Sequence, residues 1–242
     1  MSKIEARLHW NHVYRTTNYS KNVTDRSATI LDRATDFFGD LRGKRLLEIG
    51  CGGGAASLHF ARQGAEVVAV DISDTAVEHL KGEMQRQGLT TVSPQLCDGM
   101  NISSLGQFDA VFGSMILHHI EPFAQFADIL FQTLTPGGKA FFWENNAHSR
   151  LLVWCREYLV GRFGIPKHGD NDEFPLTPDE LDELKARFRV RVEYPELFLF
   201  RLISIYLLRG HARKAFDVID EYFYQKNMFV KYSYRQYLML TK

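Results

Sequence analysis

Leu46-Leu47-Glu48-Ile49-Gly50-Cys51-Gly52-Gly53-Gly54 is the stretch that decides the fold of this chain. Its apolar residues are typical of a short strand, and four of its last five residues are glycines. The next segment, residues 55–63, reads as a helix. Glycines allow a sharp turn and a close approach of a ligand to the main chain, and a helix N-terminus offers free N–H groups. The stretch therefore predicts a strand, loop and helix that cradle a ligand.

Acidic residues follow the first three predicted strands. Glu48 lies at the end of the first strand, the second strand ends in Asp71, and the third is followed by Asp98. Ligands of open α/β sheets bind at the carboxyl ends of the strands. Three acids on one rim favour a ligand with a positive centre, a ribose and an adenine amine, and they repel a pyrophosphate.

The glycines alone leave a second interpretation open. Gly50, Gly52 and Ala55 also satisfy the dinucleotide-binding pattern G-x-G-x-x-A. Asp71 follows at the place where an acid that binds ribose hydroxyls is expected, and both kinds of cofactor contain a ribose. An NAD(P)-dependent oxidoreductase is therefore the alternative, although Glu48 is poorly placed beside a pyrophosphate.

Five motifs resemble those of the class I S-adenosylmethionine-dependent methyltransferases, in the order that this family has. The resemblance covers residues 45 to 144 and is weaker before residue 43 and between residues 145 and 188. The motifs are L-L-E-I-G-C-G-G-G, V-V-A-V-D-I-S, Cys97-Asp98, F-D-A-V-F-G-S-M-I-L-H-H-I and Leu134-Thr135-Pro136-Gly137-Gly138-Lys139.

The resemblance implies S-adenosylmethionine as the cofactor. Asp71 is expected to accept hydrogen bonds from both ribose hydroxyls. Asp98 is expected to accept a hydrogen bond from the adenine amine, and the alternative is that it is only a turn residue before Gly99. Glu48 is expected to organise either the glycine loop or the methionyl end of the cofactor. The full set of expected cofactor-binding residues is Glu48, Gly50, Cys51, Gly52, Asp71, Ile72, Asp98, Gly99, Met100 and Ser114.

The candidate catalytic residues are His118 and His119, which lie on a segment that begins beside the expected cofactor site. Either is a candidate general base or a structural histidine, and neighbours on a helix do not share a face. The candidate acceptor-binding residues are Tyr14, Tyr19, Glu144 and His148, with a helix cap at Asn145 or Asn146 as the alternative after the fifth strand. Because no compact ligand spacing is present, we expect no metal.

Alternation of strands and helices predicts an α/β fold. We expect a Rossmann-like seven-stranded sheet, mostly parallel with an antiparallel last strand, and helices on both faces. The predicted strands are residues 45–49, 66–70, 92–96, 109–113, 139–144, 189–194 and 234–241, and the predicted helices between them include 55–63, 74–87 and 121–134.

We expect one domain over residues 1–242, because no Pro/Gly/Ser-rich linker divides the chain. Residues 1–43 read as an N-terminal helical lid or a cover for the sheet, and residues 44–144 as the cofactor-binding core. Residues 145–187 and 197–232 read as helical insertions on the acceptor side. These insertions favour an enclosed pocket for a small-molecule acceptor, whose methylated atom is oxygen, nitrogen or carbon.

Composition narrows the class of protein. Lys plus Arg and Asp plus Glu both number 29, so we expect no nucleic-acid partner. Three separated cysteines without a C-x-x-C motif favour a reducing cytoplasm. The first residues are charged, unlike a secretory signal, and the apolar run at 197–208 is too short for a membrane span. A non-catalytic regulatory subunit that keeps the cofactor fold is a further alternative.

Overall fold

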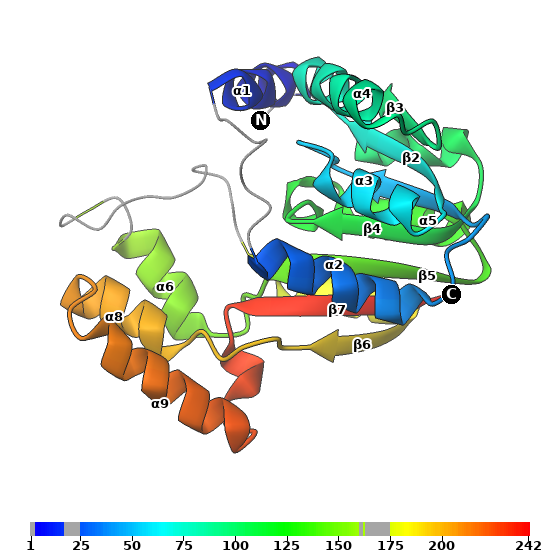
Figure 1. Ribbon diagram of the computed structural model, residues 1–242. Helices are drawn as coiled ribbons and strands as arrows, with labels where there is room; N and C mark the ends of the chain where they lie inside the picture. The colour runs from blue at the N-terminus through cyan, green and yellow to red at the C-terminus, as the bar shows by residue number, and fades with distance from the viewer. Residues whose placement is uncertain (1–2, 17–24, 160–161, 163–174) are drawn as a thin grey trace.

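The computed structural model describes residues 3–16, 25–159, 162 and 175–242. Within them, a seven-stranded sheet has the order β3-β2-β1-β4-β5-β7-β6 (Figure 1). β7 pairs antiparallel with both β5 and β6, and the other pairs are parallel, so the predicted fold class is confirmed. The strands are β1 (Arg45–Ile49), β2 (Glu66–Asp71), β3 (Val92–Leu96), β4 (Phe108–Ser114), β5 (Leu134–Asn145), β6 (Arg189–Glu193) and β7 (Arg235–Thr241).

The α-helices cover both faces of this sheet. Those that pack on the face with Leu46 and Phe112 are α2 (Asp25–Phe38), α3 (Ala55–Arg62) and α4 (Asp74–Gln87). Those that pack on the face with Leu47 and Val111 are α5 (Phe123–Thr133) and α7 (Pro178–Lys185). The central strands are therefore buried on both sides, which explains their nearly continuous apolar sequences.

Local signals set the ends of several helices. Thr177 and Glu180 form a reciprocal capping box at the start of α7, and Pro178 is its first residue. The predicted helix over 121–134 begins at Phe123 instead, and Leu134 already belongs to β5. These short shifts do not alter the order of the elements.

A second group of helices lies beyond β7, away from the first strands (Figure 1). It consists of α6 (Arg150–Tyr158), α8 (Phe200–Leu208) and α9 (Arg213–Gln225). Leu152, Cys155, Leu202 and Tyr206 form its own apolar cluster. The buried carboxylate of Asp220 accepts the N–H groups of residues 199–201, which ties α9 to the start of α8.

The remaining helix, α1 (Lys3–Thr16), lies beside α4 at the far end of the molecule (Figure 1). Short 3₁₀ turns occupy Gly99–Leu105, Leu117–His119 and Val230–Tyr232. All three cysteines are free thiols. None of the helices in the described ranges is long and apolar enough to cross a membrane.

Gly54 gives a stability test of the cradle. Its φ is +79°, and a Cβ there would collide with Leu80 Cδ1. We expect Gly54→Ala to lower the free energy of unfolding by about 1–2 kcal/mol, the cost of left-handed backbone, with the collision adding to it. The matched control is Gly82→Ala in α4, where a Cβ meets no atom within 4 Å. It should raise stability by roughly 0.5–1 kcal/mol. Urea denaturation of both variants measures the difference, and equal values would refute this view of the loop.

Candidate cofactor and acceptor site

A cavity of about 370 Å³ lies at the carboxyl ends of β1 to β4. Its walls combine backbone of the glycine loop, three acids and apolar side chains. Seven of the predicted cofactor residues line it, namely Gly50, Asp71, Ile72, Asp98, Gly99, Met100 and Ser114. The remaining lining residues are Lys3, Ala6, Trp10, Tyr14, Ile49, Cys97, Met115, Ile116, His119, Ile120 and Glu121.

Side chains of Tyr14 and Ile116 approach the main chain of the glycine loop closely. Gly50 and Gly52 have φ values of +73° and +46°. A Cβ on Gly52 would stand 2.8 Å from Tyr14 Oη, and one on Gly50 would stand 2.9 Å from Ile116 Cδ1. Only glycine leaves room for this approach, so Tyr14 and Ile116 pack directly against the main chain of the loop.

Asp71 joins two loops beneath the cavity. It is 6% exposed, and its two carboxylate oxygens accept the N–H groups of Gly52 and Ser73, each at 2.9 Å. Burial raises the pKa of Asp71, and these backbone hydrogen bonds oppose the shift. The carboxylate therefore fixes the glycine loop against the turn after β2, and it also forms part of the cavity wall.

Glu48 does not reach the cavity wall. It is 4% exposed, and its carboxylate accepts a hydrogen bond from Ser57 Oγ in α3. Burial raises the pKa of Glu48 to about 8, although the Ser57 hydrogen bond opposes this shift. Of the two roles expected for Glu48, this position supports organising the glycine loop and its helix. Cys51 and Gly52, which were also expected to contact the cofactor, are buried beside it and do not line the cavity.

Asp98 has two partners. Its Oδ1 accepts the N–H of Met100 at 2.9 Å, so the turn that the sequence offered as an alternative is present. Its Oδ2 lies 2.7 Å from Lys3 Nζ. Because Asp98 also lines the cavity, the turn and a ligand contact do not exclude each other.

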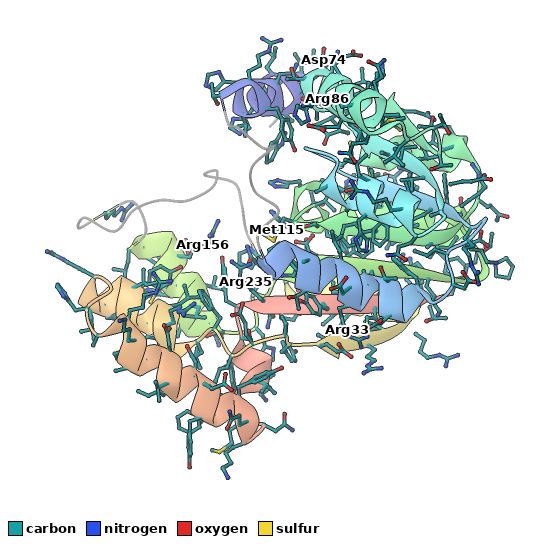
Figure 2. All side chains as sticks on the ribbon, in the orientation of Figure 1. Arg33, Asp74, Arg86, Met115, Arg156 and Arg235 are labelled. Atoms are coloured by element: carbon teal, nitrogen blue, oxygen red, sulfur yellow. The ribbon has the colours of Figure 1, made fainter. Side chains whose placement is uncertain are left out.

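The described helices of the N-terminal region lie in two places. Helix α1 lines the cavity. It is tied to the rim by an ion pair between Arg7 and Asp74 at 2.8 Å (Asp74 is labelled in Figure 2) and by Ser73 Oγ, which donates to Asn11 Oδ1 at 2.6 Å. Helix α2 instead packs on the sheet. Sequence reasoning missed Lys3 and Arg7, since single exposed cations near a terminus carry no motif or periodicity. Tyr14 lines the cavity, and Tyr19 lies outside the described residues.

The two histidines occupy different environments. His119 lines the cavity and meets the Trp10 ring edge-on, with centroids 5.5 Å apart. Burial lowers the pKa of His119 to about 4, and the charges of His118 and His9 act in the same direction. The side chain of His118 is 3% exposed and does not line the cavity. Its Nδ1 lies 2.7 Å from Glu144 Oε2, and its buried Nε2 has no hydrogen-bond partner among the described residues.

Glu144 does not face the cavity, in contrast to the acceptor contact expected from the sequence. It is fully buried. While one oxygen meets His118, the other accepts the N–H groups of Ile116 and Leu117, each at 2.7 Å. Register explains this position, because β5 runs parallel to β4 and places Glu144 just beyond the end of that strand. Glu144 therefore fixes the loop that carries His119.

His148 also lies off the cavity wall. Its ring contacts Tyr232 at 5.2 Å, and its backbone N–H donates to Asn146 Oδ1 at 2.9 Å. The carboxamide of Asn146 binds the carbonyls of Lys231 and Ser233, which is a structural role. In the part of the chain that the structure describes, no group of three His, Cys, Asp or Glu could hold a metal ion.

Comparison with known proteins finds similarity to methyltransferases. Residues 46–138 match the family model described as a methyltransferase domain. The chain is 30% identical over 155 residues to a ubiquinone biosynthesis O-methyltransferase of Aeromonas salmonicida, covering 62% of this chain and 64% of that protein. It is 32% identical over 157 residues to a ubiquinone biosynthesis O-methyltransferase of a Caulobacter species, covering 63% of this chain and 62% of that protein.

Solved structures share the fold at lower identity. The N-methyltransferase NodS of Bradyrhizobium japonicum, in complex with S-adenosyl-L-homocysteine, has a TM-score of 0.59 at 13% identity, with 96% of this chain and 98% of that chain covered. The chain spans about three fifths of the length of curated relatives that it matches.

Glu48 predicts a pH dependence of stability. Its pKa is about 8 in the folded protein, against 4.5 ordinarily. The protonated form of Glu48 is therefore favoured by folding. Its contribution to the free energy of unfolding is fully present below about pH 4.5 and is lost as the pH rises through 8. We expect Glu48→Gln to gain stability relative to the parent between about pH 5 and 9, as measured by urea denaturation. The control is Asp40→Asn. Because the Arg42 hydrogen bonds lower the pKa of Asp40 to about 2, the stability difference between this variant and the parent should stay constant from about pH 5 to 9. Parallel profiles for Glu48→Gln and the parent would contradict the assignment.

Proposed function

We propose that this chain, which belongs to the class I S-adenosylmethionine-dependent methyltransferases, transfers a methyl group to an oxygen atom of a small-molecule acceptor. The observation that carries the proposal is the cavity that joins the glycine loop, Asp71, Asp98 and His119. The choice of oxygen rests on the relatives, whose names are those of O-methyltransferases. Because the chain matches only part of their length, the nature of the acceptor is inferred from its own residues.

The residues present fit the cofactor of this family. Gly50 lines the cavity without a side chain, and Asp71 and Asp98 offer acceptor oxygens at the ends of β2 and β3. We assign the ribose hydroxyls to Asp71 and the adenine amine to Asp98. When bound, S-adenosylmethionine supplies a methyl group already activated by its sulfonium centre.

The chain itself has to align the acceptor, exclude water and, for a hydroxyl acceptor, receive a proton. Trp10, Tyr14, Ile116 and Ile120 supply apolar and aromatic wall, which suits a planar acceptor. His119 is the histidine on this wall, and its low pKa leaves a neutral imidazole with a free lone pair at neutral pH. We therefore propose His119 as the group that contacts the acceptor hydroxyl, with His118 and Glu144 holding its loop in position.

Two alternatives remain distinguishable by binding. An NAD(P)-dependent oxidoreductase would bind NADH at this cavity, and a non-catalytic subunit would bind the cofactor without transferring its methyl group. The family match favours neither. The cytoplasmic location and the lack of a nucleic-acid partner stay predictions.

Asp71 provides the test of cofactor binding. Asp71→Ala removes the ribose acceptor and should weaken S-adenosylhomocysteine binding by about 1.5–3 kcal/mol, the scale of hydrogen bonds to a charged group. Isothermal titration calorimetry measures the change. Glu66→Ala, which removes an exposed acid at the opposite end of the same strand, should bind normally. Unchanged affinity in a folded Asp71→Ala variant, or tight binding of NADH by the parent alone, would refute the assignment.

His119 provides the test of catalysis. His119→Ala should lower methyl uptake by a panel of phenolic acceptors by about 10²-fold, with unchanged S-adenosylhomocysteine affinity. Since the pKa of His119 is lowered to about 4, the parent rate should be flat with pH above about pH 6 with respect to this group. His118→Ala and Glu144→Gln serve as comparisons. They change the side chains that hold the His119 loop in position, but they do not change the residues that line the cavity. If His119→Ala retains turnover within a few-fold of the parent, proton removal does not involve it.

A further inference from the structure

Helix α1 reaches across the cavity from the loop after β3 to the loop after β1. The residues of α1 that line the cavity are spaced three or four apart, so they share one face of the helix. They are Lys3, Ala6, Trp10 and Tyr14. At the start of the helix, Lys3 pairs with Asp98 after β3. Near its end, Tyr14 packs on Gly52 in the loop after β1.

The order of the strands gives the direction in which the cofactor is expected to lie. This direction rests on the proposed function, which assigns the adenine amine to Asp98 after β3 and the ribose hydroxyls to Asp71 of β2. The next strands in the sheet are β1 and β4, and residues at their carboxyl ends complete the cavity wall. The sulfonium lies beyond the ribose in S-adenosylmethionine. We therefore expect it beside the ends of β1 and β4.

The cavity wall at the ends of β1 and β4 carries no charged side chain among the described residues. It consists of Ile49, Gly50, Ser114, Met115, Ile116 and His119, with Trp10 and Tyr14 from α1. Burial lowers the pKa of His119 to about 4, so that its ring is neutral at neutral pH. The acid of β1, Glu48, turns to Ser57 and does not line the cavity. A sulfonium at this place has no carboxylate beside it in the described wall.

The three acids that line the cavity have other partners. Asp98 pairs with Lys3, and Glu121 accepts the N–H of Phe123 at the start of α5 at 2.9 Å. Asp71 accepts two backbone N–H groups, and its proposed ligands are the ribose hydroxyls. The charge of the cofactor therefore has to be stabilised by groups other than these acids, since a desolvated charge without a partner is costly.

Two aromatic rings face this uncharged end of the cavity. Trp10 and Tyr14 lie one helical turn apart on α1, with ring centroids 5.9 Å apart and ring planes tilted by 32°. Tyr14 packs on the glycine loop, and Trp10 meets the His119 ring at 5.5 Å. The two rings thus extend from the loop after β1 to the loop after β4, which is the place expected for the sulfonium.

We propose that the rings of Trp10 and Tyr14 bind the positive charge of the sulfonium and so favour S-adenosylmethionine over its neutral product, S-adenosylhomocysteine. An aromatic ring attracts a cation that lies within about 6 Å of its centre, and the attraction is larger when the cation is desolvated. Cofactor and product share their adenine, ribose and amino-acid groups. Residues that bind those groups cannot distinguish the two, and the sulfonium is where a preference has to arise.

The preference has a consequence for turnover. On transfer, the acceptor oxygen bonds to the methyl carbon, the hydroxyl proton passes to His119, and the electron pair of the broken C–S bond stays on sulfur. The sulfur is then neutral, so its attraction to the rings ends and the product is held less tightly. Because the acceptor meets the methyl group at this same place, the rings also border the acceptor.

Calorimetric titration of the full chain without an acceptor tests the proposal, because binding is then measured apart from turnover. Trp10→Leu keeps an apolar side chain and removes the ring. It should weaken binding of S-adenosylmethionine, and of its amine analogue sinefungin, by about 5- to 30-fold, while the affinity for S-adenosylhomocysteine stays within about twofold. Tyr14→Leu should act in the same direction. Trp10→Phe and Tyr14→Phe, which keep a ring, should retain most of the preference.

The matched control is His12→Leu, which removes an exposed ring of α1 that does not line the cavity, and it should change neither affinity. Asp71→Ala gives the contrast, because it should weaken cofactor and product alike. Equal losses for both ligands in Trp10→Leu, or an unchanged ratio of the two affinities, would overturn the proposal and leave the proposed function intact. A parent that binds neither ligand would refute both. Circular dichroism melting checks that every variant is folded.

Discussion

The buried carboxylate of Asp71 is the constraint on which the cavity depends. A carboxylate at this depth loses hydration, and the N–H groups of Gly52 and Ser73 compensate it. The same bonds tie the loop after β1 to the turn after β2. Gly52 has to adopt a positive φ to present its N–H, so the glycine and the acid form one unit. The cavity floor thus has a fixed shape in the chain itself.

Glu144 repeats this arrangement on the other side of the sheet's centre. In the order β2-β1-β4-β5, the acid of each outer strand holds the loop of its inner neighbour. Asp71 at the end of β2 holds the loop after β1, and Glu144 of β5 holds the loop after β4. The cavity lies between these two loops. A methyl transfer that depends on alignment requires this kind of rigidity more than it requires covalent participation by the protein.

Much of this architecture could be predicted from the sequence, because the strands are short apolar runs with glycines or acids at their ends. Asp71 and Asp98 are found at the rim for that reason. The inward turn of Glu48 to Ser57 could not be predicted, since it depends on how α3 packs. Glu144 was misjudged because strand register, rather than position in the chain, decides which side its carboxylate faces. His118 and His119 differ in environment although they are adjacent, because successive residues of the 3₁₀ turn Leu117–His119 point in different directions.

The ties of α1 bear on the lid role expected for it. Two of them are ion pairs, and the cations of these pairs, Lys3 and Arg7, are 72% and 46% exposed. Such pairs contribute about 0–1 kcal/mol each. The buried bond between Asn11 and Ser73 and the edge contact of Trp10 with His119 are the stronger anchors. Ile4 and Leu8 face outward and add no burial. Since few apolar contacts hold α1, its local opening should need much less free energy than global unfolding. Such an opening would also break the edge contact of Trp10 with His119, so the position of α1 and the surroundings of the His119 ring are coupled.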